Sequence, residues 1–168
     1  HLEYYKLSYR NKHYFPLSKV FTLALNADNG YGDTYGDSGQ YPFFESFYAG
    51  GPRSVRGFES NSVGPKDSSA EQDPLGGNMK IVGNAELLFP PPIDAFKDTA
   101  RLAFFLDIGN VFDTSEQDPD FDELRASVGF AASWLSPIGA LSFSIAEPLD
   151  DEAGDETETF QFNLGQTF

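Results

Sequence analysis

The sequence contains no cysteine, which excludes a disulfide framework and a thiolate metal site but not an oxidising compartment. It also lacks any apolar run near the ~20 residues of a membrane-spanning helix. No signal peptide opens the chain, so it is either cytosolic or a mature piece whose targeting segment lies elsewhere. The two histidines, His1 and His13, form no recognisable nucleophilic site with a serine and an acid. We therefore expect no enzyme activity, no catalytic residue, no metal and no cofactor.

Basic residues are few, and the acidic residues are unevenly spread. The formal net charge is −15 over 168 residues, and half of the 26 acids fall in the segments 113–123 and 147–158, which contain no lysine or arginine. Neither segment has the ordered ligand spacing of a calcium loop. We expect solvated loops there, with divalent-cation binding as the alternative. The negative charge argues against nucleic acid as a partner.

Apolar and polar residues alternate along most of the chain. Large apolar side chains occupy every second position from Leu102 to Ile108, and Asp107 falls on the opposite face. This period of two is typical of β-strands. Strands are expected at about 2–14, 19–29, 78–89, 101–112, 124–135, 139–147 and 158–168, with a long loop at about 30–77. Part of that loop, at 44–49, could pair as an eighth strand.

The predicted strands have two unlike faces. One is nearly all apolar, and the other carries small polar side chains with single charges at Lys80, Glu86 and Asp107. A soluble sandwich would carry many more charges on its outer face. A transmembrane barrel instead turns an apolar face to lipid and a polar face to a lumen, and its sheet has to close.

Short, proline-containing turns alternate with long polar connections along the chain. The predicted fold is therefore all-β: an antiparallel up-and-down meander that forms a partial or small transmembrane β-barrel of seven or eight strands. Seven antiparallel strands cannot close as a simple up-and-down barrel, and the chain begins abruptly at His1. We therefore expect residues 1–168 to be the C-terminal portion of a larger barrel domain.

The run Gly50-Gly51-Pro52-Arg53-Ser54-Val55-Arg56-Gly57-Phe58 fits neither a strand nor a helix. Its glycines and proline favour a tightly folded loop whose backbone closely approaches other groups. Arg56 brings a rigid planar donor suited to buried carboxylates.

Several segments together resemble the BamA family, the central subunit of the outer-membrane β-barrel assembly machinery. The matching segments are Phe44–Gly51, Ser54–Phe58, Gly64–Lys66, Gly76–Asn78, Ala85–Pro90, Phe105–Asp113, Trp134–Gly139 and Phe160–Gly165. They cover nearly the whole chain, and the loop motif is highly specific.

The resemblance implies that the long loop folds back into the barrel lumen. Its motif residues are Val55, Arg56, Gly57 and Phe58, and the acids that pair with the arginine are Glu86 and Asp107. Both acids also fall on the predicted lumenal face. The residues Phe160, Phe162, Leu164, Gly165 and Phe168 resemble the C-terminal targeting strand of outer-membrane barrels.

The resemblance also implies a function without covalent chemistry in the bacterial outer membrane. The family inserts β-barrel proteins by pairing strands at an open seam. The implied partners are outer-membrane lipid and lipopolysaccharide, unfolded outer-membrane proteins and, mainly through absent periplasmic domains, the lipoproteins of the machinery. We expect the fragment alone to be inactive and able to self-associate through its strand edges. The alternatives are the barrel of a two-partner secretion or translocation transporter, and a soluble acidic all-β domain that binds sugar or calcium.

Overall fold

The computed structural model describes residues 2–69, 71–115 and 117–165. The long strands are β1 (Tyr4–Pro16), β2 (Thr22–Thr34), β4 (Met79–Phe89), β5 (Ala100–Phe112), β6 (Arg125–Ser136), β7 (Gly139–Asp150) and the shorter β9 (Phe160–Leu164). Two short strands are β3 (Gly57–Phe58) and β8 (Thr157–Glu158), and three 3-10 turns are η1 (Phe43–Glu45), η2 (Asp94–Phe96) and η3 (Phe121–Glu123). Across the described ranges, no helix is both long and apolar enough to cross a membrane.

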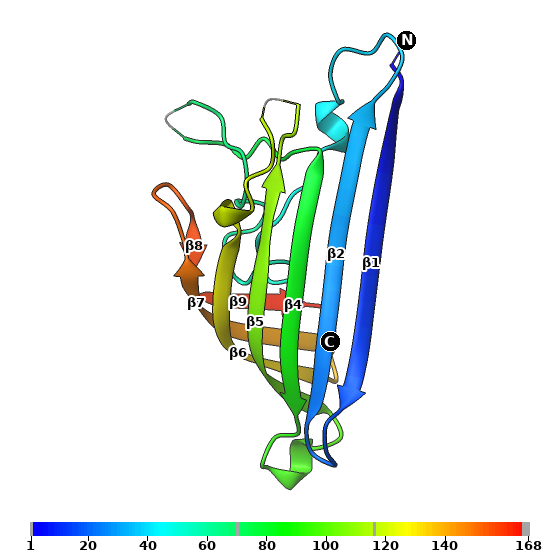
Figure 1. Ribbon diagram of the computed structural model, residues 1–168. Coiled ribbons are helices and arrows are strands. Elements are labelled where there is room, and N and C mark those ends of the chain that lie inside the picture. The colour runs from blue at the N-terminus through cyan, green and yellow to red at the C-terminus, as the bar shows by residue number, and fades with distance from the viewer. Residues whose placement is uncertain (1, 70, 116, 166–168) are drawn as a thin grey trace.

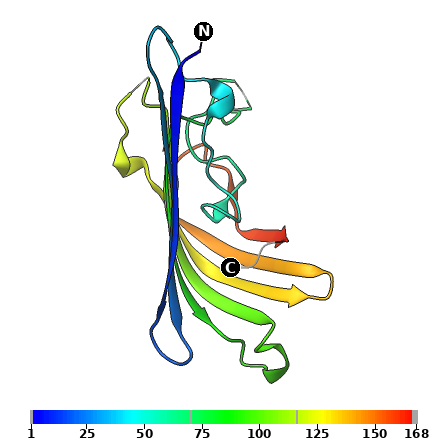
Figure 2. The ribbon, with the colours of Figure 1, turned by 90° about the vertical axis from the view of Figure 1, so that its right-hand side faces the viewer.

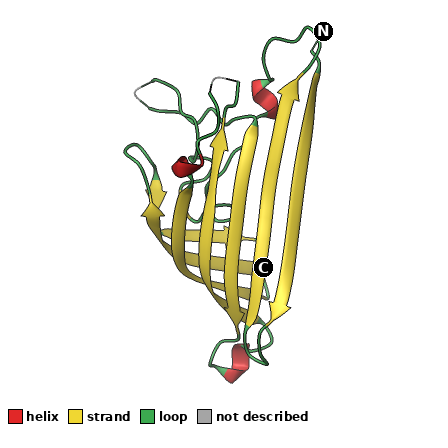
Figure 3. Cartoon of the chain, in the orientation of Figure 1, coloured by secondary structure: helices red, strands yellow, loops and turns green. Residues whose placement is uncertain are grey.

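The main sheet has seven antiparallel strands in the order β1-β2-β4-β5-β6-β7-β9, and β3 pairs separately with β8 (Figure 1). Within the main sheet, each strand lies beside the strand that precedes it in that sheet. The predicted all-β antiparallel up-and-down meander is therefore confirmed. Within the described residues the sheet does not close, because β1 and β9 stand at its two ends (Figure 3).

The sheet is strongly curved, and the long loop lies on its concave side (Figure 2). We call this side the lumenal face and use "the long loop" for the residues 35–78 between β2 and β4. The short turns after β1 and β4 lie at the end of the sheet opposite to the long loop (Figure 1).

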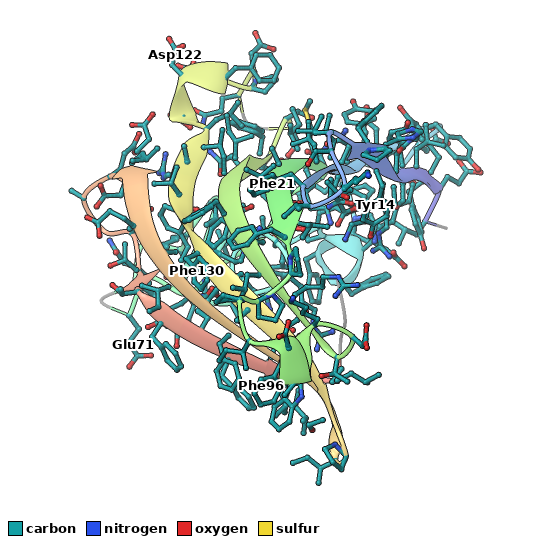
Figure 4. All side chains as sticks on the ribbon, turned by 90° about the horizontal axis from the view of Figure 1, so that it is seen from below. Tyr14, Phe21, Glu71, Phe96, Asp122 and Phe130 are labelled. Atoms are coloured by element: carbon teal, nitrogen blue, oxygen red, sulfur yellow. The ribbon has the colours of Figure 1, made fainter. Side chains whose placement is uncertain are left out.

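The two faces of the sheet have the side chains that the alternation predicts. Phe104 points outward with 56% of its surface exposed, whereas its neighbours Ala103 and Phe105 are buried on the lumenal face. The same alternation runs along β9, where Phe160 and Phe162 are exposed and Gln161 is buried. Side chains therefore project from both sides of the curved ribbon (Figure 4).

β2 continues to Thr34, five residues beyond the end that the alternation predicts, so the long loop begins later than expected. Glycines are typical of loops, but Gly30 and Gly32 lie within β2. A Cβ on Gly30 would lie 2.3 Å from the ring of Phe47, so the missing side chain makes room for an aromatic residue of the long loop. Glycine in a strand commonly marks such a close approach.

The expected segments 44–49 and 158–168 differ from the structure. The residues Phe43–Glu45 form η1, and Phe47 and Ala49 make only isolated bridges to Gly77 and Val63. Residues 157–158 leave the main sheet and pair with the long loop as β8, so β9 begins only at Phe160. Phe168 lies outside the described residues.

Two clusters of buried apolar side chains line the lumenal face. One joins neighbouring strands and consists of Ala24, Leu88, Ala103, Phe105, Ala131 and Ala146. The other joins the long loop to β4 and β5 and consists of Ala49, Val55, Phe58, Val63, Val82 and Val111. The second cluster seats the arginine motif against the sheet.

Candidate functional site

The loop motif folds into a compact double turn. The backbone N–H of Gly51 donates to the carbonyl oxygens of Val55 (3.2 Å) and Phe58 (3.0 Å), and the N–H of Ser54 donates back to Gly51 (3.1 Å). The amide of Asn84 on β4 donates to the carbonyl of Ser54 over 2.7 Å. These bonds fix the loop backbone, so the side chain of Arg56 starts from a defined position.

Arg56 is buried between two carboxylates, with 5% of its surface exposed. Its Nε and Nη2 donate to the two oxygens of Asp107 at 2.7 and 2.8 Å, and its backbone N–H donates to Asp107 Oδ2 at 3.0 Å. Its Nη1 donates to Glu86 Oε1 at 2.7 Å. Paired N–H donors on one carboxylate form the strong, directional geometry that arginine favours.

The strand pairing explains why two acids meet one arginine. Glu86 on β4 stands opposite Phe105 on β5, and Asp107 lies two residues further along the same face. Side chains in this diagonal relation are about 7–8 Å apart, a gap that a guanidinium can bridge. The guanidinium carbon lies 3.6 Å from the centroid of the Phe105 ring, so the ring forms the floor of the site.

The site keeps Arg56 charged. Burial alone would lower the pKa of its guanidinium, but the hydrogen bonds and negative charge of Asp107, followed by those of Glu86, outweigh burial and raise that pKa. A buried cation held by two hydrogen-bonded carboxylates is well suited to fixing a loop. It does not by itself constitute a nucleophile or an acid–base pair.

Gly57 lets the motif touch the opposite wall of the lumen. Its φ of +90° is one that side chains with a Cβ rarely adopt, and an added Cβ would stand 3.0 Å from the Cβ of Ala146 on β7. Phe58, the next residue, is fully buried. The motif thus contacts β4 and β5 through Arg56 and contacts β7 through Gly57.

The segment that leads into β9 is also attached to the motif. Gly57 pairs with Glu158 and Phe58 with Thr157, forming β3 and β8. Gln161 on β9 donates from Nε2 to the carbonyl of Phe58 over 2.7 Å. The long loop is therefore bonded both to the middle and to the last strand of the sheet.

The segment 147–158 is largely exposed, as its composition predicts, but β7 continues to Asp150 and three of the segment's acids pair with cations. Arg125 contacts Asp155 at 2.6 Å and Glu152 at 3.2 Å, and Lys66 of the long loop contacts Glu156 at 3.2 Å. The cations come from other parts of the chain, so a search within the segment could not find them. No group of three or more histidine, cysteine or acidic side chains able to hold a metal occurs in the described part of the chain.

The predicted site residues fall into two places. Val55, Arg56, Gly57 and Phe58 lie together with Glu86 and Asp107 on the lumenal face. The predicted targeting residues of β9, Phe160, Phe162 and Leu164, point away from the motif and are exposed. Gly165 follows β9, and its N–H donates to Ala140.

Sequence reasoning missed the parts played by two lumenal residues, Phe105 and Gln161. The alternation placed both on the lumenal face, which is the signal that could have found them. Their contacts with the motif depend on how the long loop enters the lumen, and no local pattern encodes that path.

The comparisons with known proteins identify the family. The Omp85 superfamily domain matches residues 1–168. The outer membrane protein assembly factor BamA of Neisseria meningitidis serogroup B is 41% identical over 99% of this chain and 24% of its own length. The sorting and assembly machinery component 50 homolog of Bos taurus is 42% identical over 74% of this chain and 29% of its own length.

A solved structure has the same fold. The crystal structure of BamA from Haemophilus ducreyi lacking POTRA domains 1–3 superposes with a TM-score of 0.86 at 33% identity, over 95% of this chain and 34% of that chain. The chain thus spans about a quarter of the Neisseria relative and a third of the Haemophilus chain.

Proposed function

Because this chain belongs to the Omp85 superfamily, we propose that it is the part of an assembly factor that helps β-barrel proteins fold into the bacterial outer membrane. The observation that carries the proposal is the 41% identity with a BamA over 99% of the chain. The bacterial outer membrane is the location that these relatives indicate.

The outer face of the sheet supports a position in lipid. Phe104, Leu106 and Ile108 on β5, and Ile145 on β7, are all exposed on it. Soluble monomers rarely leave so continuous an apolar surface open to water. This observation favours the membrane over a soluble sugar- or calcium-binding domain.

The proposed mechanism is strand pairing without covalent chemistry. An incoming strand needs an edge whose backbone N–H and C=O groups have no neighbour. Among the described residues, the last strand β9 stands at one end of the sheet, and we propose its outer edge as the place of pairing. The docked long loop would keep the strands that flank the lumen in place while an edge is used. The clients would be unfolded outer-membrane proteins, with lipid, lipopolysaccharide and lipoproteins as further partners.

A secretion or translocation transporter is the second candidate from the sequence. It would need a lumen open to a passing chain, whereas the long loop lies on the lumenal face here and Arg56 secures it. The matched BamA proteins are also named as assembly factors. The assembly role is therefore the better supported of the two.

The experiment uses the full-length protein that carries this chain, reconstituted in liposomes. A urea-unfolded outer-membrane barrel is added, and its folding is followed by the mobility of unheated samples on a gel. We expect the parent protein to accelerate folding over empty liposomes and Arg56→Ala to lose most of that acceleration.

The matched control is Arg53→Ala, which removes an exposed arginine from the same loop. It should fold the client at the parent rate. Equal folding rates in empty and protein-containing liposomes would rule out the proposed function.

A further inference from the structure

Within the described residues, the last strand is paired to the main sheet over a shorter length than the other long strands. β7 and β9 pair at five positions, from Ile145–Phe160 to Leu141–Leu164, whereas β1 and β2 pair at thirteen. Two further bonds flank this pairing, from the N–H of Ala146 to the carbonyl of Thr159 and from the N–H of Gly165 to the carbonyl of Ala140. The residues before Thr159 pair with the long loop. Pro148 has no N–H to offer, which suits a point where the pairing ends.

Gln161 adds an attachment that the main sheet does not supply. Its side chain is 3% exposed and points into the lumen. The Nε2 group donates to the carbonyl of Phe58 over 2.7 Å, and Oε1 accepts from the N–H of Gly57 over 3.4 Å. The same Nε2 group also donates to Glu158 Oε2 over 3.2 Å.

The side-chain amide therefore binds the motif as a neighbouring backbone would. A primary amide carries both a donor and an acceptor, so it can satisfy an N–H and a C=O of adjacent residues together. A leucine of similar size would take the acceptor from the Gly57 N–H and would leave the Phe58 carbonyl with only the Gly51 N–H as donor, which is costly at a buried site. An asparagine is one methylene shorter and would not reach them both.

We infer that Gln161 is a positioning residue that couples docking of the long loop to the order of the last strand. The inference rests on the proposed function, because β9 presents an edge at which a client strand would pair. When the motif is seated, Gln161 holds β9 extended in its five-residue pairing with β7. When the motif leaves its seat, β9 loses this lumenal bond and frays.

Such coupling must be reciprocal. If docking of the loop stabilises β9, then disorder of β9 must weaken docking by the same factor. The side chain of Arg56 bonds to Glu86 and Asp107, whereas that of Gln161 bonds to Gly57, Phe58 and Glu158. The loop backbone between Arg56 and Phe58 therefore links the two sets of hydrogen bonds.

The test is hydrogen–deuterium exchange on the full-length protein without client, followed in two peptides, 55–59 and 160–164. Gln161→Leu should raise the exchange rate of both peptides by about tenfold, the factor for one lost buried hydrogen bond. Arg56→Lys keeps the charge but loses the paired donors, and it should raise exchange in 160–164 as well as in the loop. Asn163→Leu, on the same strand and face, should leave 55–59 at the parent rate.

If Gln161→Leu does not fold, Gln161→Met serves in its place, because its unbranched side chain fills the same space and makes neither bond to the motif. Parent-like exchange of 55–59 in a folded Gln161 variant overturns the inference, and so does parent-like exchange of 160–164 in Arg56→Lys. The client-folding assay on the parent protein decides the proposed function separately. Failure there leaves the exchange result standing, and a parent-like exchange result leaves the assembly role standing.

Discussion

At the scale of single residues, the centre of the structure is an arginine whose two acidic partners are unequal. Asp107 is completely buried and accepts three of the four bonds from Arg56, one of them from its backbone. Glu86 accepts one. Removing a partner from a buried pair is costly because it leaves a charge without compensation.

Replacement of either acid by its amide should therefore lower stability by different amounts. Asp107→Asn should reduce the free energy of unfolding by about 3–5 kcal/mol. Glu86→Gln should cost less, about 1–3 kcal/mol, because the three bonds from Arg56 to the Asp107 carboxylate remain. Denaturant unfolding of the full-length protein in detergent micelles measures both values, and the exposed Glu71→Gln provides the control. Equal costs for the two variants would contradict the unequal roles.

Gly57 offers a second test at this scale, because two physical effects can be separated there. Gly57→Ala meets both an unfavourable φ of +90° and the Cβ of Ala146 at 3.0 Å. The backbone effect alone should cost about 1–2 kcal/mol. Adding Ala146→Gly removes the contact but not the backbone effect, so it should restore stability only in part. Complete rescue in denaturant unfolding would show that the contact alone matters.

At the scale of elements, the strands of the main sheet were predictable because each has one apolar face and one polar face. The period of two identified β4, β5, β6 and β7 as strands. It also placed Glu86 and Asp107 on the lumenal face. The same reasoning predicted too early an end for β2, because Gly30 is typical of a loop in sequence. Its lack of a side chain instead makes room for the ring of Phe47. Long-range packing is the information that the local pattern does not contain.

The course of the long loop was equally hidden. Resemblance paired Arg56 with the two acids, but the bonds from Gln161 to the motif join residues 103 and 104 positions apart. Likewise, the alternation predicts a last strand from residue 158, but Glu158 belongs to β8. It leaves the sheet because Gly57 and Phe58 offer it a partner.

The η1 element provides a prediction about pH. Lys6 on β1 donates to Glu45 Oε2 over 3.1 Å, and the Tyr4 hydroxyl donates to Oε1 over 3.0 Å. The hydrogen bond from Lys6, and next that from Tyr4, lower the pKa of the Glu45 carboxyl in the loop. A lowered pKa means that folding favours the carboxylate. The contact therefore contributes fully above the ordinary glutamate pKa and is lost as the pH falls through the lowered one.

Hydrogen exchange of residues 41–49 measures this contact, once corrected for the intrinsic pH dependence of exchange. Protection should decline across that acidic window in the parent protein. Glu45→Gln cannot titrate and should show no such decline. An identical decline in the variant would assign the effect to another group.

At the scale of the whole molecule, the outer face of the sheet is apolar, and its lumenal face is covered by the long loop. The outer rings of Phe89, Phe104 and Phe130 contact one another across three strands, with centroids 5.4 to 6.4 Å apart. The lumenal side is occupied by the long loop and its ion pairs. This is the inverse of a soluble protein, in which the apolar side chains are gathered inside.

A charge placed on the outer face should show how deep a position lies in the bilayer. Phe104→Arg introduces a charge on the outer face within β5 and should cost about 2–4 kcal/mol for folding into lipid vesicles. Ile138→Arg lies in the turn between β6 and β7, where Ile138 is 82% exposed, and should cost about 0–1 kcal/mol. Equal costs would mean that Phe104 does not face the hydrocarbon.

The distances along the chain between the motif and its partners also set an order of folding. Arg56 meets Glu86 after 30 residues and Asp107 after 51, whereas Phe58 meets Gln161 only after 103. Closing longer stretches of chain costs more entropy, and folds rich in such contacts form slowly. The motif can engage β4 and β5 early, but its seat is complete only when the last strand arrives. The complete set of contacts around the motif can therefore form only after β9 has joined the sheet.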